Sequence, residues 1–370
     1  MTTSTITTTE APTAASRSRD PFMDGLRALS LFVVVAWHWV FTVISWQHGP
    51  HAGNPIGSAP GLWALTWVLQ VMPLFFFVGG FAHLRAWESV ERAGGGYATF
   101  CRRRLGRLLK PAALCVGAVV AVRVAAGAIF PSVTWLGSAF TLVLSPLWFL
   151  CVYVVLVCLA PLGIWMHRRH GALVPVLLAA AACLVDVARF HGHVPVVAWL
   201  NFVFVWAFAH QLGFFWERLA AAPRRVALAL AGGGLLGLVA LTNIGLYPKS
   251  MVGVPGEAFS NMGPPTICIL ALCLLQAGVV ALVRPAACRW LERPQARRLV
   301  EWATRRSMTV YLWHFVGFSV AYAALWVVGL HAPQTPGGLW WLERPLYVLV
   351  PAMVTVPMVR AFSRFDGVSR

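Results

Sequence analysis

The sequence predicts an all-α, polytopic membrane protein with about ten transmembrane helices and both termini in the cytoplasm. Three observations predict this fold class. Of the 370 residues, 59% are hydrophobic and only 11% are charged, and the mean hydropathy is +0.73. A soluble domain of this length is far less apolar. Apolar runs of about 20 residues also recur along the chain, which is the length that an α-helix needs to cross a bilayer.

The apolar runs, bounded by charged residues or by Gly and Pro, give the order of the predicted helices. Pro146 interrupts the stretch before the fourth span, so the pattern there is the least regular. The ten spans are expected near Leu29–Trp46, Leu62–His83, Pro111–Phe130, Leu147–Trp165, Ala172–Ala188, Pro195–Trp216, Val226–Leu246, Pro264–Val283, Met308–Val328 and Leu346–Val359.

The cationic residues alternate with these spans and predict the topology. Of the 29 Lys and Arg residues, all but Arg123, Arg189, Lys249 and Arg344 fall on the side of the N-terminus. Cytoplasmic loops are enriched in Lys and Arg, so both termini are expected in the cytoplasm. This topology accounts for the formal net charge of +17, and no nucleic-acid partner is expected.

One membrane domain is expected to occupy residues 21–362. Residues 1–20 are rich in Thr, Ser and Ala. They are expected to form a disordered cytoplasmic segment. A cleaved signal peptide is not expected, because no small-residue cleavage site follows a short apolar core. Residues 363–370 are expected to form a short cytoplasmic tail. The eight cysteines are scattered and predict neither a disulfide framework nor a metal cluster.

Arg27 and His38 lie eleven residues apart at the start of the membrane domain. In a helix this spacing is three turns plus roughly 20°, so the two side chains share one face about 16 Å apart along the axis. Arg27 would then lie at the membrane edge and His38 within the membrane. Ionisable residues inside membranes are usually functional. The alternative is a structural histidine that bonds a neighbouring helix.

Further segments accompany this pair over most of the chain. Asp24-Gly25-Leu26-Arg27 precedes His38, an aromatic stretch occupies residues 73–81, and Arg104 and Arg107 precede the third span. Residues 146–150 and 307–314 are weaker landmarks. Together these segments resemble the acyltransferase-3 family of bacterial integral-membrane O-acyltransferases. The family opens with an Arg, ten residues and a His, and it has an aromatic stretch ending in Ser-Gly-Phe and an Arg-x-x-Arg motif.

The resemblance implies transfer of an acetyl or other short acyl group from acyl-CoA to a hydroxyl of a carbohydrate-containing acceptor. That acceptor would be a surface glycan, a glycolipid or a glycosylated secondary metabolite. Acyl-CoA would be a substrate, with no tightly bound cofactor and no metal, and the protein would lie in the inner or plasma membrane among lipids. Two departures stand out: Ala28 replaces a usual Gly, and Gly79 replaces the usual Ser, which removes a serine hydroxyl at that point.

The residues themselves suggest how such a transfer would proceed. Attack of an alcohol on a thioester needs a base for the hydroxyl proton and donors for the developing oxyanion. His38 is the expected base, because a neutral imidazole accepts a proton near neutral pH. His314 is a second catalytic candidate that would place the acceptor or complete a polar network with His38, with a structural role as the alternative.

The arginines are expected to bind the donor. Arg27, Arg104 and Arg107 lie at the predicted cytoplasmic edge, where guanidinium groups suit the phosphates of coenzyme A. The alternative is that they only set the topology. Asp24, one turn before Arg27, is expected to pair with and orient that guanidinium, or else simply to begin the helix. His83 and His210, in other spans, are expected to be structural.

A different class of function uses the same residues. A multi-pass transporter or flippase for an anionic lipid or metabolite would use the arginines as a binding site and His38 in a proton relay. A structural partner in an envelope assembly would instead tolerate substitution of Arg27 and His38. No internal repeat is apparent, which mildly disfavours a transporter built from two related halves.

Overall fold

The computed structural model describes residues 20–45, 49–331, 333 and 335–365. Ten helical segments of this part of the chain are long and apolar enough to cross a membrane. The predicted all-α membrane fold and its number of spans are therefore confirmed. Residues 1–19 of the predicted N-terminal segment and residues 366–370 of the predicted tail lie outside the described residues.

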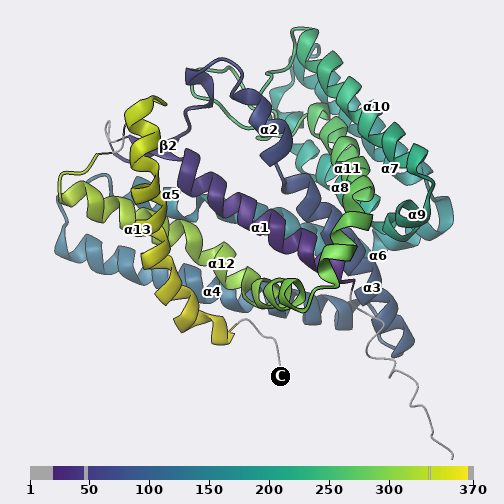
Figure 1. Cartoon of the computed structure of the whole chain (residues 1–370), viewed down its shortest axis with the longest axis horizontal. Helices are drawn as coiled ribbons and strands as arrows, with labels where there is room; N and C mark the ends of the chain where they lie inside the picture. Colours follow the sequence, from purple (N-terminus) through teal and green to yellow (C-terminus); the bar gives the residue numbers. More distant parts are fainter. Residues whose placement is uncertain (1–19, 46–48, 332, 334, 366–370) are drawn as a thin grey trace, which may run out of the picture.

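The elements form a bundle in which segments far apart in sequence lie side by side (Figure 1). Helix α1 packs on α12 and α3, α3 on α8, and α10 on α11. In chain order the elements are α1 (Pro21–Phe41), β1 (Val43–Ser45), β2 (His51–Gly53), η2 (Ile56–Ser58), α2 (Trp63–Leu69), α3 (Met72–Arg92), α4 (Tyr97–Ile129), α5 (Leu136–Leu144), η3 (Ser145–Leu147), α6 (Trp148–His170), α7 (Leu173–Phe190), η4 (Pro195–Leu200), α8 (Asn201–Phe214), α9 (Trp216–Ala221), α10 (Arg224–Asn243), α11 (Ile267–Leu291), α12 (Pro294–Val327), α13 (Gly338–Phe362) and η5 (Ser363–Phe365).

The bundle has two opposite faces, which we call the basic face and the cavity face. The basic face is the one at which α1 begins, α3 ends and α13 ends, along the lower side of Figure 1. The cavity face is the one at which α1 ends, and it carries the β1–β2 hairpin, α2 and the connection between α10 and α11. Helices α4 and α12 contain 33 and 34 residues because basic turns precede their apolar parts.

The first helix is longer at its start and shorter at its end than the predicted span Leu29–Trp46. Asp20 caps its N-terminus, because the carboxylate accepts hydrogen bonds from Phe22 N at 2.9 Å and Met23 N at 3.4 Å. The helix ends at Phe41, and β1 then pairs antiparallel with β2. The hairpin was not predicted, since strands of three residues leave no periodic pattern to detect.

One predicted span is broken within the membrane domain, and another begins after a break. The second divides into α2 and α3 at Gln70 and Val71, and Pro73 lies in the first turn of α3. The fourth is preceded by α5, and the short helix η3, which contains Pro146, joins α5 to α6. Proline cannot donate a backbone hydrogen bond, so helices change course at such points. Both breaks border the cavity described below.

Candidate active site

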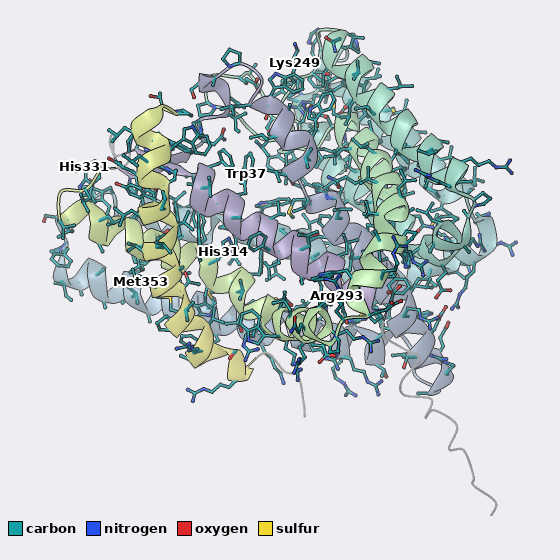
Figure 2. The ribbon with its side chains drawn as sticks, in the orientation of Figure 1. Trp37, Lys249, Arg293, His314, His331 and Met353 are labelled. Carbon is teal, nitrogen blue, oxygen red and sulfur yellow. The ribbon has the colours of Figure 1, made fainter. Side chains whose placement is uncertain are left out.

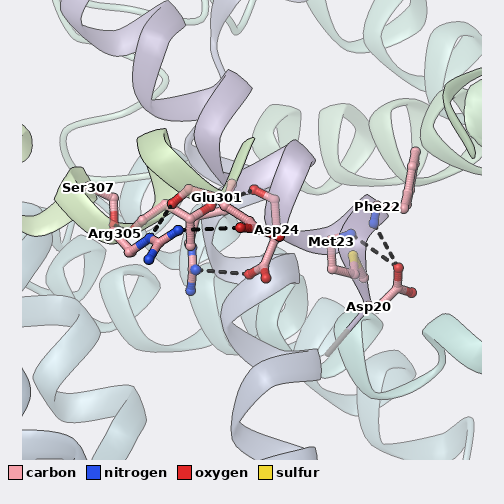
Figure 3. A network of polar contacts seen from close by, with 9 residues as sticks. Asp20, Phe22, Met23, Asp24, Glu301, Arg305 and Ser307 are labelled. Atoms are coloured by element: carbon pink, nitrogen blue, oxygen red, sulfur yellow. Dashed lines mark hydrogen bonds and ion pairs between the residues drawn. The ribbon is translucent and has the colours of Figure 1, made fainter. Parts of the chain in front are cut away.

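The first turns of α1 hold an ion pair on the basic face. Arg27 Nη2 lies 2.9 Å from Asp24 Oδ1, and Thr304 Oγ1 of α12 donates to the backbone carbonyl of Asp24 at 3.5 Å. Figure 3 shows Asp24 in this polar network, with Asp20 at the start of the same helix. Asp20, not Asp24, begins the helix. Of the two roles expected for Asp24, the structure therefore shows the pairing with Arg27 and not the start of the helix.

Arg27 keeps unused hydrogen-bond donors. Its side chain is 35% exposed. Its Nε is buried and has no hydrogen-bond partner among the described residues. A guanidinium has five N–H donors in a planar fork, and Asp24 uses only one end of it. The free donors suit an anionic group that approaches from the basic face.

Arg104 of α4 lies close to Arg27 and to Arg107, which is on the same helix as Arg104. Arg104 Nη2 donates to the carbonyl of Ala82 at 2.5 Å, which fixes this guanidinium against α3. Arg104 is within electrostatic reach of both Arg27 and Arg107, and Arg107 is exposed. Asp24 is the carboxylate that pairs with this group in the described part of the chain. Three cations with one carboxylate leave a net positive site. We call these three residues the arginine cluster.

His38 lies three turns further along α1 and bonds the histidine that was singled out on α12. The distance from His38 Nδ1 to His314 Nε2 is 2.9 Å, and the two rings stack with centroids 5.1 Å apart. Trp39 Nε1 donates to the backbone carbonyl of His314 at 3.2 Å, which holds the two helices together beside the pair. The helix is unbroken from Pro21 to Phe41, so the axial separation of Arg27 and His38 stays at about 16 Å.

The hydrogen bonds determine which nitrogen of His38 is basic. His314 Nδ1 lies 2.7 Å from the backbone carbonyl of Tyr311, which can only accept. His314 Nδ1 therefore carries the hydrogen, and in the neutral ring Nε2 is an acceptor. It accepts from Nδ1–H of His38. The lone pair of His38 Nε2 is thus left for another partner, as a general base requires.

A cavity of about 350 Å³ lies beside His38 at the cavity face. Residues from the last turns of α1, β2, the α2–α3 break, η3 and the start of α6, the α10–α11 connection and α12 line it. Figure 2 shows Trp37 on α1 and His314 on α12 at this level of the bundle. The cavity brings His38 and Tyr311 to one wall, whereas the arginine cluster lies at the other end of α1. Phe75, which belongs to the aromatic stretch at residues 73–81, also lines the cavity.

The two histidines expected to be structural form a second pair, which sequence reasoning missed. His83 Nδ1 of α3 lies 2.9 Å from His210 Nε2 of α8, and both residues are buried. The helices cross closely here, because a Cβ at Gly80 would overlap the carbonyl of His210 and one at Gly213 would overlap that of Phe77. Each glycine lies three residues from one of the histidines. This spacing was the sequence signal that could have indicated a close contact between the two helices at these histidines.

The glycine in place of the family's usual serine also has a local cause. A Cβ at Gly79 would lie 2.9 Å from a ring carbon and 3.2 Å from the hydroxyl oxygen of Tyr153. Tyr153 is packed against His83, with ring centroids 5.2 Å apart, and against Phe76. A serine at position 79 would therefore have to displace this tyrosine.

Comparison with known proteins identifies the family. The acyltransferase domain model of the acyltransferase-3 family matches residues 20–360. No curated protein and no solved structure matches the chain. The matched region begins at the N-cap of α1 and extends into the last turn of α13. It includes the arginine cluster, the His38–His314 pair, nine of the candidate spans and nearly all of the tenth. The chain therefore belongs to the acyltransferase-3 family and is a multi-pass membrane acyltransferase.

Proposed function

We propose that this protein transfers a short acyl group, such as acetyl, from acyl-CoA to a hydroxyl of a carbohydrate-containing acceptor in the plasma membrane. The observation that carries the proposal is the His38–His314 pair on the wall of a cavity. Family membership supplies the acyl transfer.

The arginine cluster favours a donor with its anionic groups far from the reacting carbon. Arg27 and His38 are separated by about 16 Å along α1. Acyl-CoA fits this separation, because the pantetheine arm separates its phosphates from the thioester, whereas an acyl phosphate has both groups adjacent. Ser30 lies between the two residues, and its buried hydroxyl has no hydrogen-bond partner among the described residues. It would suit an amide of that arm.

The proposed reaction balances without any added reactant. His38 Nε2 takes the proton from the acceptor hydroxyl as its oxygen attacks the thioester carbonyl. The new C–O bond forms, the C–S bond breaks, and the leaving thiolate takes the proton back from the imidazolium. His314 Nε2 accepts the hydrogen bond from His38 Nδ1 throughout, and this bond strengthens when His38 is charged.

The acceptor is proposed to enter from the cavity face. The cavity beside His38 is bordered by the β1–β2 hairpin and by Val252 and Gly253 of the α10–α11 connection. The distribution of Lys and Arg predicts that this face lies outside the cytoplasm. A hydroxyl from that side and a thioester from the basic face would meet at His38.

Mass spectrometry of a deletion strain tests the proposal. Surface glycolipids and secreted glycosylated metabolites are compared after complementation with wild type, His38→Ala or His170→Ala. His170 is exposed at the end of α6 and serves as the control. One species should lose the mass of an acyl group in the deletion, and wild type and His170→Ala should restore it while His38→Ala does not.

Three other results would contradict parts of this proposal. Restoration by His38→Ala would show that His38 is not the base. If the masses of the glycolipids and metabolites are the same with and without well-expressed protein, the proposed transfer to a glycosylated acceptor is wrong. Movement of an anionic lipid or metabolite, lost in His38→Ala, would then support the transporter.

A further inference from the structure

We propose that the cavity beside His38 binds an uncharged, hydroxylated ring, such as a neutral sugar, and rejects rings that carry a carboxylate or phosphate. The inference rests on the proposed acyl transfer at His38 and narrows the class of its acceptor. Its basis is the chemistry of the side chains that line the cavity.

The cavity wall holds no fixed charge among the described residues. None of the Asp, Glu, Lys or Arg residues lines it, and His38 is neutral in the hydrogen-bond arrangement derived above. An anion that enters such a site loses its hydration and gains no counter-charge, which is costly. The arginine cluster, where an anion is expected, lies at the other end of α1. The distribution of charge therefore suits an anionic ligand at the arginine cluster and an uncharged ligand in the cavity.

Aromatic rings form a large part of the apolar wall. They come from four helices, α1, α3, α6 and α12. Apolar and aromatic side chains with a few polar groups are typical of small-molecule sites, and the volume of about 350 Å³ is at the small end of their range. The C–H faces of a sugar ring can pack on such aromatic faces. The rings are those of Trp37, Phe75, Trp148, Phe149, Tyr311 and Phe315.

Two neutral amides are placed to recognise hydroxyl groups. Gln70 Oε1 accepts from Met72 N at 3.1 Å, and its Nε2 donates to the sulfur of Met262, a weak acceptor. Asn54 Nδ2 donates to the carbonyl of Gly253 at 2.7 Å, and its Oδ1 accepts from Ile56 N at 3.2 Å. A side-chain amide donates two hydrogen bonds and accepts two. Each amide therefore keeps a donor and an acceptor for a ligand.

Ser145 adds an exposed hydroxyl to the same wall, whereas Thr66 does not. No hydrogen-bond partner of the Ser145 hydroxyl is seen in the described part of the chain. Thr66 Oγ1 donates to the carbonyl of Trp63 and accepts from Met251 N, so its hydroxyl holds the α10–α11 connection in place. The groups left for a ligand are neutral donors and acceptors, which match hydroxyls.

Protection of His38 from diethylpyrocarbonate measures binding without requiring turnover. The protein is placed in phosphatidylcholine nanodiscs, free of sugar detergents, and modification of the His38 peptide is followed by mass spectrometry. The probes are octyl β-glucoside and octyl β-glucuronide, and methyl β-glucoside and methyl β-glucuronide. The glucosides should half-protect His38 at a concentration at least about 10-fold lower than the matched glucuronides, because a carboxylate has no counter-charge here. Modification of His170 should stay unchanged.

Two variants test which features of the cavity wall cause the selectivity. Ser145→Lys places a cation on the cavity wall and should remove most of the preference against the glucuronides. Gln70→Met should raise the half-protecting concentration of the glucosides by about fivefold, as expected for one lost hydrogen bond. Protection by the octyl glucoside alone would assign the ring to a membrane-embedded lipid, and protection by the methyl glucoside as well would assign it to a soluble compound. Both outcomes support a neutral ring.

The inference is overturned if wild type is protected equally by both members of a pair, better by the glucuronides, or by none of the probes. Acyl transfer is measured separately, as His38-dependent loss of an acyl group in the deletion strain. Selective protection without such transfer would refute the proposed function and keep the binding class. Transfer without selective protection would do the reverse.

Discussion

At His38, the contact with His314 decides how the ring can act. His314 Nδ1 donates to the Tyr311 carbonyl, so His314 Nε2 must accept from His38 and leave His38 Nε2 free. The first residue of this arrangement lies in α1 and the others in α12. The sequence analysis named a polar network with His38 as one of several roles for His314, and the 2.9 Å contact joins these positions, which are 276 residues apart. Such a contact depends on how α1 and α12 pack, which no local pattern reveals.

Substitution of His314 should separate a positioning role from a purely structural one. His38→Ala should lower kcat by about 10²- to 10⁴-fold, as expected for loss of a general base. His314→Leu should lower kcat by about 10- to 100-fold, because it leaves Nδ1–H of His38 without its acceptor. His314→Gln, whose Oε1 can accept that hydrogen, should restore part of kcat with little change in KM. Equal kcat in the Leu and Gln variants would contradict the positioning role.

Ser30 offers a test of the donor path. Its hydroxyl is buried and unpartnered among the described residues, one turn beyond Arg27 on α1. Ser30→Ala should raise KM for acetyl-CoA by about fivefold, the value of one hydrogen bond, and leave kcat nearly unchanged. Ser319→Ala is the matched control, since its hydroxyl already donates to the carbonyl of Phe315. An unchanged KM in Ser30→Ala would exclude contact with the donor.

At the level of elements, the end of α1 is held by groups from two other helices. Arg344 of α13 is buried, and its Nη1 donates to the carbonyl of Val40 at 3.2 Å and to the hydroxyl of Tyr322 at 3.4 Å. Tyr322 in turn donates to the carbonyl of Thr42 at 3.3 Å. The last carbonyls of a helix lack internal partners, and a cation is favourable there. The turn that carries His38 is thereby capped.

Removal of this cap should disturb the last turn of α1. Arg344→Met keeps an apolar side chain but removes both hydrogen bonds and the contact of the guanidinium with the Trp340 ring. We expect a lower thermal unfolding temperature and a fall in kcat of about tenfold, because the carbonyl of Val40 loses its donor and Tyr322, which donates to the carbonyl of Thr42, loses the hydrogen bond from Arg344. Arg123→Met changes an exposed arginine and should alter neither quantity. A normal kcat in a destabilised Arg344→Met protein would limit Arg344 to stability.

The same elements show what sequence can predict. The ten spans and the shared face of Arg27 and His38 follow from hydropathy and helix geometry, which are local properties. The topology signal counted Arg344 as an exception on the far side, and the structure explains it as a buried helix cap. The break at Gln70 fell inside an apolar run, where hydropathy alone gives no warning. The break at Ser145 lies beside Pro146, which made the pattern before the fourth span irregular. They became meaningful only because they border the same cavity.

For the whole molecule, α1 connects two sites with different chemistry. The arginine cluster on the basic face is cationic and suits phosphate groups. The cavity beside His38 is uncharged in its described lining and suits a neutral acceptor. Because the two sites lie at opposite ends of one helix, donor and acceptor are expected to approach from opposite sides of the membrane. This expectation belongs to the assembled bundle, since neither site alone specifies a direction.

Sidedness in liposomes tests this last expectation. Protein reconstituted in one orientation, as determined by proteolysis of an exposed loop, receives acetyl-CoA on one side and a membrane-impermeant glycosylated acceptor on the other. Transfer should occur only when acetyl-CoA is on the basic face and the acceptor on the cavity face. Arg27→Met should raise KM for acetyl-CoA by about 10-fold or more, through loss of a charge-assisted contact, and leave KM for the acceptor unchanged. Efficient transfer with both substrates confined to the basic face would contradict the two-ended arrangement, since the acceptor would then reach His38 without entering the cavity.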